Sequence, residues 1–149
     1  MKLDNKKALR DIVQEFSLED LQVEQFRVFV NLLESWSLRT NLISKNDVSR
    51  IVSKHIGESL EIERLSLLRD NLKILDLGAG AGFPGVPLAI LHPKSQFTLI
   101  DSRRKKSLFL QEVADECSLK NIHVVCDRVE DFGASLSPQY DLVLARAVA

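Results

Sequence analysis

The stretch Lys73-Ile-Leu-Asp-Leu-Gly-Ala-Gly-Ala-Gly-Phe-Pro-Gly85 predicts more about the fold than any other part of the chain. An apolar run that contains one acidic residue, Asp76, is followed by glycines at alternate positions and then by Pro84, a residue typical of helix starts. A strand, a glycine turn and a helix form a nucleotide-binding corner, because glycines let the backbone approach a ligand and the first helical N–H groups face it. The dinucleotide fingerprint G-x-G-x-x-G is excluded, since Phe83 stands where it needs glycine.

The hydrophobic pattern changes once along the chain, near this corner. Residues 1–70 have helical periodicity and carry no glycine before Gly57, which predicts an N-terminal helical segment. Residues 71–149 alternate between short apolar runs and helical stretches, which predicts a parallel sheet covered on both sides. The predicted strands are Lys73–Leu77, Gln96–Asp101, Asn121–Cys126 and Tyr140–Arg146, and the predicted helices are Pro84–Leu91 and Ser102–Cys117. The fold class is therefore α/β, with an open, mainly parallel Rossmann-like sheet of about four strands.

The connections between the strands predict where a ligand binds. Right-handed crossovers place the first three strands side by side in one direction, and the fourth strand should return to the other side of the first. This reversal opens a crevice at the carboxyl ends of the first and fourth strands, where open α/β sheets bind ligands. The residues expected around it are Gly78–Gly85, Asp101 with Ser102, Asp127–Glu130, and Arg146.

Composition limits the classes of partner. The chain has 149 residues, a formal charge of −1 and 28% charged residues, so no global field attracts it to nucleic acid or to an anionic membrane. No run approaches the roughly 18 apolar residues of a membrane span, and the first residues lack the apolar core of a signal peptide. Cys117 and Cys126 show no metal-ligand spacing, and we expect both to be reduced core residues. We therefore expect a soluble, cytoplasmic protein without a metal site.

Two acidic positions at predicted strand ends have competing interpretations. Asp101 lies 23 residues after Gly78, where a carboxylate can accept hydrogen bonds from both hydroxyls of a ribose. The alternative is a helix N-cap, for which Ser102 is an equally good candidate. The segment Asp127–Glu130 follows the third strand, where the adenine end of a nucleoside is expected, or it is a solvated charged turn.

The basic residues are also open to two interpretations. Arg146 ends an apolar strand, where an arginine is rarely placed without a partner. At the predicted crevice that partner is a carboxylate or a phosphate, and a buried pair with Asp76 is the competing idea. The cluster Arg103-Arg-Lys-Lys106 is by default a solvated helix face, with a phosphate contact as the alternative. His55 lies on an apolar helical face, which is more typical of a core histidine than of a functional one.

Several motifs together resemble one protein family. The alternate glycines after Asp76 look like motif I of S-adenosylmethionine-dependent methyltransferases. The continuation Gly82-Phe-Pro-Gly-Val-Pro87 is similar to the bacterial rRNA methyltransferases called RsmG or GidB. The further matching motifs are Phe97–Ser102, Lys105-Lys106, Phe109-Leu110, Arg128-Val-Glu130, Tyr140-Asp141 and Ala145-Arg-Ala147, with a looser likeness at Trp36, Asn41-Leu42, His55-Ile56 and Ser59-Leu60.

This resemblance implies transfer of a methyl group from S-adenosylmethionine to N7 of a guanine in 16S rRNA of the small ribosomal subunit. It implies that Gly78 and Phe83 hold the amino-acid end of the cofactor, with Val129 and Glu130 at the adenosine end. Arg146 completes the implied site near the reacting groups, and Gly80 and Asp101 are the further residues expected to bind the cofactor. The basic cluster at residues 103–106 supplies cations that position the RNA. Guanine N7 has a free lone pair and no proton to remove, so no catalytic base is assigned.

The chain departs from this family at its end. It stops at Ala149, where members of the family continue through further strands and helices, so we expect residues 71–149 to be a partial methyltransferase domain in a C-terminally truncated chain. Tyr140–Ala147 is then an apolar edge strand. Two alternatives to an active enzyme remain open: a cofactor-binding remnant without transfer activity, and a methyltransferase that acts on another substrate class.

Overall fold

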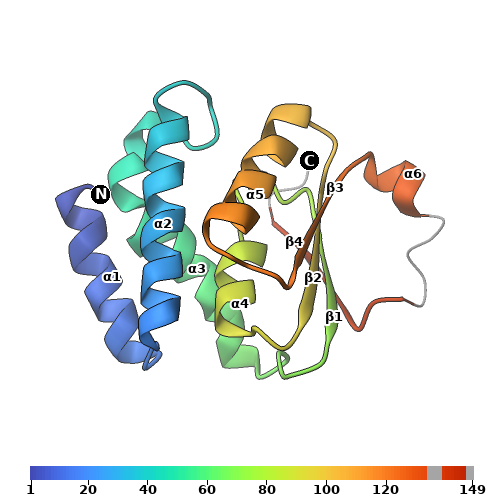
Figure 1. Ribbon diagram of the computed structural model, residues 1–149, viewed down its shortest axis with the longest axis horizontal. Coiled ribbons are helices and arrows are strands. Elements are labelled where there is room, and N and C mark those ends of the chain that lie inside the picture. Colours follow the sequence, from blue (N-terminus) through green and yellow to red (C-terminus); the bar gives the residue numbers. More distant parts are fainter. Residues whose placement is uncertain (134–138, 147–149) are drawn as a thin grey trace.

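The computed structural model describes residues 1–133 and 139–146, and its centre is a sheet of four parallel strands (Figure 1). The strands are β1 (Lys73–Leu77), β2 (Gln96–Asp101), β3 (Ile122–Cys126) and β4 (Leu142–Ala145). Their order is β3-β2-β1-β4, as the crossover argument predicts. β1 and β2 have the predicted bounds, whereas β3 and β4 are shorter than predicted. Ala147, which ends the last motif of the family resemblance, lies outside the described residues.

Helices pack against one face of the sheet, and the handedness of the connections explains which face it is. The other face is partly exposed, as at Val143 of β4, which is 52% exposed, so the predicted coverage of both faces is only partly realised in the described residues. α4 (Gly85–Leu91) and α5 (Arg104–Glu116) lie on one face, because two successive right-handed crossovers progress in the same direction (Figure 1). α6 (Val129–Gly133) precedes the reversed connection to β4 and lies on the opposite face. Both predicted helices between the strands are present, although Pro84 is the N-cap of α4 and α5 begins two residues later than predicted.

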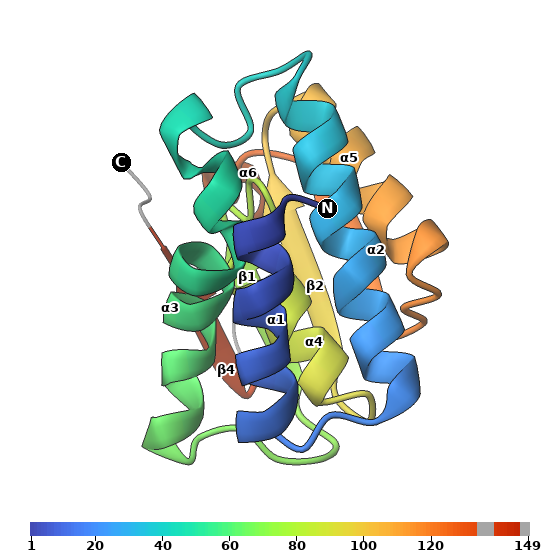
Figure 2. The ribbon, with the colours of Figure 1, turned by 90° about the vertical axis from the view of Figure 1, so that its left-hand side faces the viewer.

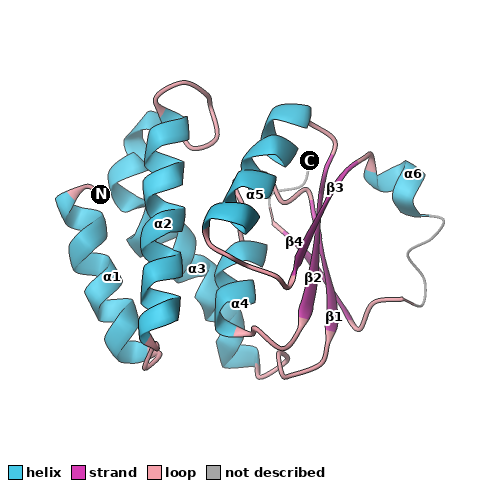
Figure 3. Ribbon diagram, in the orientation of Figure 1, coloured by secondary structure: helices cyan, strands magenta, loops and turns pink. Residues whose placement is uncertain are grey.

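A second helical layer lies outside α4 and α5 (Figures 2 and 3). It consists of α1 (Leu3–Glu15) and α2 (Asp20–Ser37), followed by four short helical segments. These segments are the 3-10 helix η1 (Lys45–Arg50), the π-helix η2 (Ile51–Ile56), α3 (Gly57–Leu60) and the 3-10 helix η3 (Glu61–Leu65). The helical character predicted for residues 1–70 is confirmed, with an irregular second half.

The position of α4 between two layers explains its composition. Its sequence, Gly-Val-Pro-Leu-Ala-Ile-Leu, has no polar side chain, and every residue from Gly85 to Ile90 is buried. A helix that is apolar on all sides must be covered on all sides. The sheet covers one side of α4, and the N-terminal helices cover the other (Figure 1).

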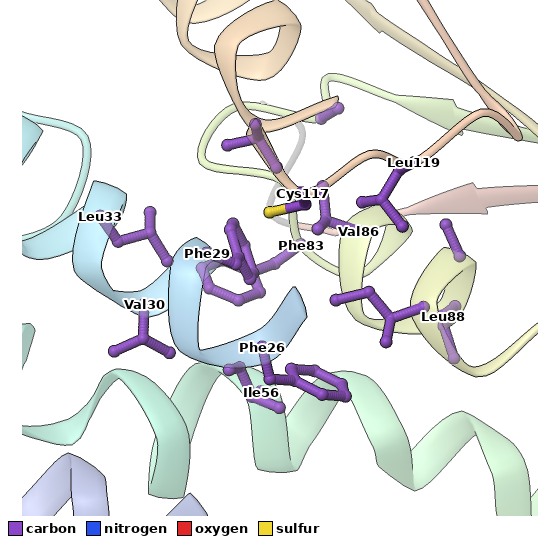
Figure 4. Packing of buried hydrophobic residues seen from close by; sticks show 14 of the residues in the cluster. Phe26, Phe29, Val30, Leu33, Ile56, Phe83, Val86, Leu88, Cys117 and Leu119 are labelled. Carbon is purple, nitrogen blue, oxygen red and sulfur yellow. The ribbon is translucent and has the colours of Figure 1, made fainter. Parts of the chain in front are cut away.

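The two parts of the chain share one hydrophobic core (Figure 4). Phe26, Phe29 and Leu33 from α2 are fully buried in the same cluster as Val86 and Leu88 from α4. Polar contacts also join the layers: Gln25 Nε2 donates to the Cys117 carbonyl at 3.1 Å, and Trp36 Nε1 donates to Glu112 at 2.8 Å. The N-terminal helices therefore pack as part of the same body as the sheet.

The cysteines differ in their surroundings. Cys117 is buried, and burial raises the pKa of its thiol to about 12. Cys126 is exposed, so the expectation that it is a core residue is wrong. It is the last residue of β3, a strand at the edge of the described sheet. Within residues 1–133 and 139–146, no helix combines the length and the apolarity needed to cross a bilayer.

Candidate functional site

The turn after β1 has the backbone conformation that its glycines suggest. Gly78, Gly80 and Gly82 all have positive φ angles, of 65°, 56° and 95°. Side chains disfavour this region, so the alternate glycines are required by the backbone path. Space adds a further requirement at Gly82, where a Cβ atom would lie 2.8 Å from Val86 Cγ2. The turn is thus held close to α4.

A cavity of about 650 Å³ opens at the carboxyl ends of the strands, where the strand order predicts a crevice. This volume lies in the usual range for small-molecule sites. The lining residues follow β1, β2 and β3 and include one residue of β4: they are Leu77, Gly78, Asp101, Ser102, Arg103, Asp127, Arg128, Val129, Glu130, Asp131 and Ala145. Four of the residues expected to bind the cofactor, Gly78, Asp101, Val129 and Glu130, therefore lie around one cavity.

Asp101 connects the glycine turn to the start of α5. Its Oδ2 accepts the Gly80 N–H at 3.0 Å, and its Oδ1 accepts the Arg103 N–H at 2.9 Å. The N-cap of α5 is Arg103, so neither Asp101 nor Ser102 is the cap that the sequence suggested. A carboxylate has about four lone-pair positions, so both oxygens retain capacity for a further hydrogen bond. Gly80 is thus joined to the cavity through Asp101, although it does not line the cavity itself.

Phe83 and Arg146 lie in a separate cluster beside the cavity. The Phe83 ring is stacked with the His55 ring at 5.2 Å between centroids and also contacts Phe29 at 5.5 Å. The Arg146 guanidinium lies over the same ring, with its carbon 5.8 Å from the centroid. The side chain of Phe83 is buried and packs in this cluster, so Phe83 contributes to the glycine turn through its backbone.

The partner of Arg146 is a carboxylate from the N-terminal segment. Arg146 Nη2 donates to Glu58 Oε2 at 2.5 Å and lies 3.2 Å from His55 Nδ1. The alternative pairing of Arg146 with Asp76 is wrong, because Asp76 Oδ2 accepts the Gly85 N–H at 2.9 Å instead. In the described part of the chain, Arg146 Nη1 is buried without a hydrogen-bond partner.

Asp76 is a fully buried carboxyl group beneath the turn. Its Oδ1 has no partner among the described residues, and burial raises the pKa of Asp76 to about 8. The hydrogen bond from Gly85 opposes this shift, whereas the charge of Asp101 adds to it. Asp76 is therefore largely protonated at neutral pH and supports the turn without adding negative charge beneath it.

The four cations at residues 103–106 do not form one face. Arg104 and Lys105 are exposed, whereas Lys106 is half-buried against the glycine turn. A Cβ atom on Gly80 would lie 3.7 Å from Lys106 Nζ. Burial lowers the pKa of Lys106, and no carboxylate of the described residues lies within ion-pair distance of it. This ammonium is therefore available to an anionic group at the turn.

Sequence reasoning missed the roles of His55 and Glu58 in the cluster around Arg146. The family resemblance at His55-Ile56 could have indicated such a role. These residues lie in the predicted N-terminal helical segment, far from the glycine motif, and nothing else in the sequence explained why they resemble the family. No group of His, Cys, Asp and Glu side chains in residues 1–133 and 139–146 has the arrangement of a metal site.

The fold and this cavity define a class of protein: a Rossmann-like α/β chain with a glycine turn after β1 and a cavity at the carboxyl ends of the strands. Two solved methyltransferase structures share the fold. A precorrin-6y C5,15-methyltransferase from Geobacter metallireducens matches with a TM-score of 0.52 and 20% identity, covering 72% of this chain and 51% of its own. A protein-L-isoaspartate O-methyltransferase matches with a TM-score of 0.55 and 13% identity, covering 95% of this chain and 47% of its own.

Sequence comparison identifies the family. Residues 22–149 match the GidB family, described as rRNA small subunit methyltransferase G, and the chain belongs to this family. Relatives named ribosomal RNA small subunit methyltransferase G are 39% identical over 133 residues in Christiangramia forsetii and 41% identical over 137 residues in Streptococcus pyogenes. These matches cover 89% and 90% of this chain but only 61% and 58% of the relatives. The chain thus spans less than two thirds of the length of these curated relatives.

Proposed function

We propose that this chain binds S-adenosylmethionine in the cavity at the carboxyl ends of β1, β2 and β3, and that it methylates guanine N7 in 16S rRNA of the small ribosomal subunit. The observation that carries the proposal is the convergence of Gly78, Asp101, Val129 and Glu130 on one cavity in a member of the GidB family. A chain that acts on the small subunit works in the cytoplasm.

The residues of the cavity suit the chemical groups of this cofactor. The carboxylates of Asp101 and Glu130 offer acceptors for ribose hydroxyls, and Val129 offers an apolar surface for the adenine ring. The Lys106 ammonium beside Gly80 suits the carboxylate of the methionine portion. In this assignment Gly78 and Gly80 let the backbone approach the ligand, while the Phe83 ring supports the turn from below.

The reaction requires little acid–base chemistry from the chain. S-adenosylmethionine supplies a methyl group on a positively charged sulfur, which makes that carbon an electrophile. Guanine N7 presents a lone pair and has no proton to lose, so the chain needs to hold the two reactants in line and to exclude water. Arg103 lines the cavity, and Arg104 and Lys105 are exposed in the first turn of α5, where they can contact phosphates of the RNA.

Calorimetric titration with S-adenosylhomocysteine tests the cofactor site. We expect binding with one site per chain, and we expect Lys106→Met to weaken it by about tenfold, because a charge-assisted hydrogen bond is lost. Lys105→Met is the matched control: it removes a neighbouring exposed cation and should leave the affinity unchanged. Absence of heat at millimolar ligand would refute the proposed site.

Incubation with labelled S-adenosylmethionine and undermethylated small subunits tests the transfer. The expected product is 7-methylguanine in 16S rRNA. Binding of S-adenosylhomocysteine without transfer would instead favour a cofactor-binding remnant. The specific reason to consider that alternative is that the chain spans only 56% to 61% of the length of the relatives it matches.

A further inference from the structure

The cluster around Arg146 joins the N-terminal helices to the edge of the cofactor cavity. His55 lies in η2 and Glu58 in α3, more than eighty residues before Arg146 along the chain. Arg146 directly follows Ala145, which lines the cavity at the end of β4. The helical segment therefore supplies both hydrogen-bonding partners for the last described residue of the sheet edge.

The chemistry of the guanidinium determines the proton position on His55. Arginine has five N–H donors and no acceptor, so His55 Nδ1, which lies 3.2 Å from Arg146 Nη2, must act as the acceptor. A histidine that accepts at Nδ1 is neutral and carries its proton on Nε2. His55 Nε2 lies 3.4 Å from Asp47 Oδ2, but it is buried without a hydrogen-bond partner among the described residues, so Asp47 acts on the imidazole through its charge. The four side chains lie in the order Asp47, His55, Arg146, Glu58. The neutral imidazole lies between a carboxylate and the guanidinium, and the second carboxylate pairs with the guanidinium.

Protonation of His55 would break this arrangement at one point. The imidazolium has N–H groups at both nitrogens, so Nδ1 can no longer accept from Arg146. The hydrogen bond is replaced by a contact between two cations, while the imidazole and the guanidinium both remain against the Phe83 ring. Glu58 alone would then hold the guanidinium, and it is half-exposed on the outer side of the cluster.

We propose that His55 and Glu58 are positioning residues that hold the Arg146 guanidinium beside the cofactor cavity, and that His55 does so only as the neutral imidazole. This inference rests on the proposed function, because Arg146 is one of the residues assigned to the cofactor. In this inference the N-terminal helices contribute to the site, because they fix the orientation of the Arg146 side chain at the end of β4.

The electrostatic surroundings favour the neutral imidazole near neutral pH. Burial lowers the pKa of His55 below its ordinary value, and the charges of Arg146 and Lys54 lower it further. The carboxylates of Asp47 and Glu58 act in the opposite direction and reduce the shift. Asp47 itself stays ionised, because hydrogen bonds from Lys54 and Arg50 hold the pKa of Asp47 well below its ordinary range. His55 is therefore the group in this cluster whose charge changes in mildly acidic solution.

An NMR titration of the three histidines tests the arrangement without any ligand. The His55 signals are assigned from their loss in His55→Asn, and the pKa of His55 is then compared in the original chain and in Arg146→Met. We expect a pKa below 6.5 in the original chain and a higher pKa in Arg146→Met, since a neighbouring cation is removed. His123, which is exposed on β3, is the internal control and should titrate identically in both. An unchanged His55 pKa would overturn the inference.

Affinity for S-adenosylhomocysteine between pH 5 and pH 8 tests the consequence for the site. The original chain should lose affinity as the pH falls through the pKa of His55. His55→Asn keeps an acceptor oxygen but does not titrate, so its affinity at pH 8 should stay within about threefold and should lose this pH dependence. His55→Phe keeps the stacking on Phe83 but removes the acceptor, and it should bind about tenfold more weakly at pH 8.

The outcomes separate this inference from the proposed function. If no variant binds S-adenosylhomocysteine at any pH, the proposed function fails, and the NMR titration still decides whether His55 and Arg146 are coupled. If the original chain binds and His55→Phe binds equally well, the proposed function stands and the positioning role is refuted. His123→Asn, a change at an exposed histidine, should leave the pH profile of binding unchanged and serves as the matched control.

Discussion

At the scale of single residues, Asp76 shows how a motif residue can act by remaining uncharged. Its carboxyl group is fully buried, and among the described residues only Gly85, in the first turn of α4, donates a hydrogen bond to it. An ionised carboxylate in that position would lack the hydrogen bonds that normally compensate for burial. Protonation removes the charge, so the residue connects β1 to α4 at a smaller electrostatic cost.

This protonation predicts a pH dependence of stability. The pKa of Asp76 rises from an ordinary value near 3.8 to about 8 on folding, so the folded chain binds more protons than the unfolded chain between these values. Its contribution to stability is therefore complete below about pH 4 and is lost as the pH rises towards 8. Asp76→Asn, which cannot ionise, should match the original chain at pH 4 and exceed its unfolding free energy by at least about 2 kcal/mol at pH 8. Urea unfolding at both pH values measures the difference, and parallel pH dependences in the two proteins would contradict it.

A pair of glycine substitutions tests close packing at the start of α4. A Cβ atom on Gly85 would lie 2.4 Å from Leu99 Cδ2 and 2.6 Å from Asp76 Oδ2. Gly85→Ala should therefore cost at least about 2 kcal/mol of unfolding free energy, through displacement of β2 or of the Asp76 carboxyl. Gly57→Ala is the control, because Gly57 is helical and its Cβ would meet only the Val52 carbonyl, at 3.6 Å.

The control substitution should stabilise the chain by up to about 1 kcal/mol, since alanine is the better helix former. Thermal unfolding of the two variants should thus shift in opposite directions from the original chain. Equal effects at Gly85 and Gly57 would show that the contact with Leu99 and Asp76 does not constrain the fold.

These residues also mark how far sequence reasoning reaches at this scale. The alternate glycines predict a turn, because a repeated glycine pattern has a backbone cause that can be recognised locally. The requirement at Gly85 arises from Leu99 on the next strand, and the partner of Arg146 comes from Glu58 on a distant helix. Such contacts depend on which elements pack together, so the sequence offered only the open choice between a carboxylate, a phosphate and Asp76.

At the scale of elements, α1 is attached to its neighbours by a buried polar side chain. Asn5 is fully buried, and its Nδ2 donates to Glu34 Oε1 and to the Val48 carbonyl, both at 2.8 Å. Its Oδ1 accepts the N–H of Val52 at 3.2 Å. One side chain therefore connects α1 to α2, to η1 and to η2, and Asn5 itself lies before the family match, which begins at residue 22.

This connection predicts a large effect for a small substitution. Asn5→Ala removes three hydrogen bonds, among them the one that pairs the buried Val52 N–H, so we expect a loss of about 2–4 kcal/mol in unfolding free energy. Lys7→Ala, on the exposed side of the same helix, should change it by less than about 0.5 kcal/mol. Chemical denaturation measures both, and a neutral Asn5→Ala would show that α1 is only loosely associated.

The elements themselves were predicted with unequal success, and the reason is physical. β1 and β2 were predicted with their observed bounds because apolar runs bounded by turn residues define buried parallel strands. The apolar residues from η1 to η3 recur at helical spacing, which predicts a helix but does not distinguish 3-10 and π turns from one continuous α-helix. The position of the cavity was predictable from the strand order alone, whereas the separate cluster of Phe83, His55 and Arg146 required the packed structure.

At the scale of the whole molecule, the division into residues 1–70 and 71–149 describes composition more than independent folding. We propose that the two parts are one cooperative unit. The buried cluster contains side chains of both, including Phe29 of α2 in contact with Phe83 of the glycine turn. α4 would expose an entirely apolar surface if the N-terminal helices detached, since it has no polar side chain.

Cooperativity of this kind predicts a single unfolding transition. Trp36, the one tryptophan, lies at the junction of α2 and α5, so its fluorescence reports on the N-terminal layer. Hydrogen exchange of the amides of β2, the buried strand between β1 and β3, reports on the sheet. The two probes should give the same midpoint in urea and the same unfolding free energy, because neither layer can bury its apolar face without the other. An earlier transition at Trp36, with β2 still protected, would instead show that the helices are a separable unit, and the positioning of Arg146 by His55 would then be lost before the sheet unfolds.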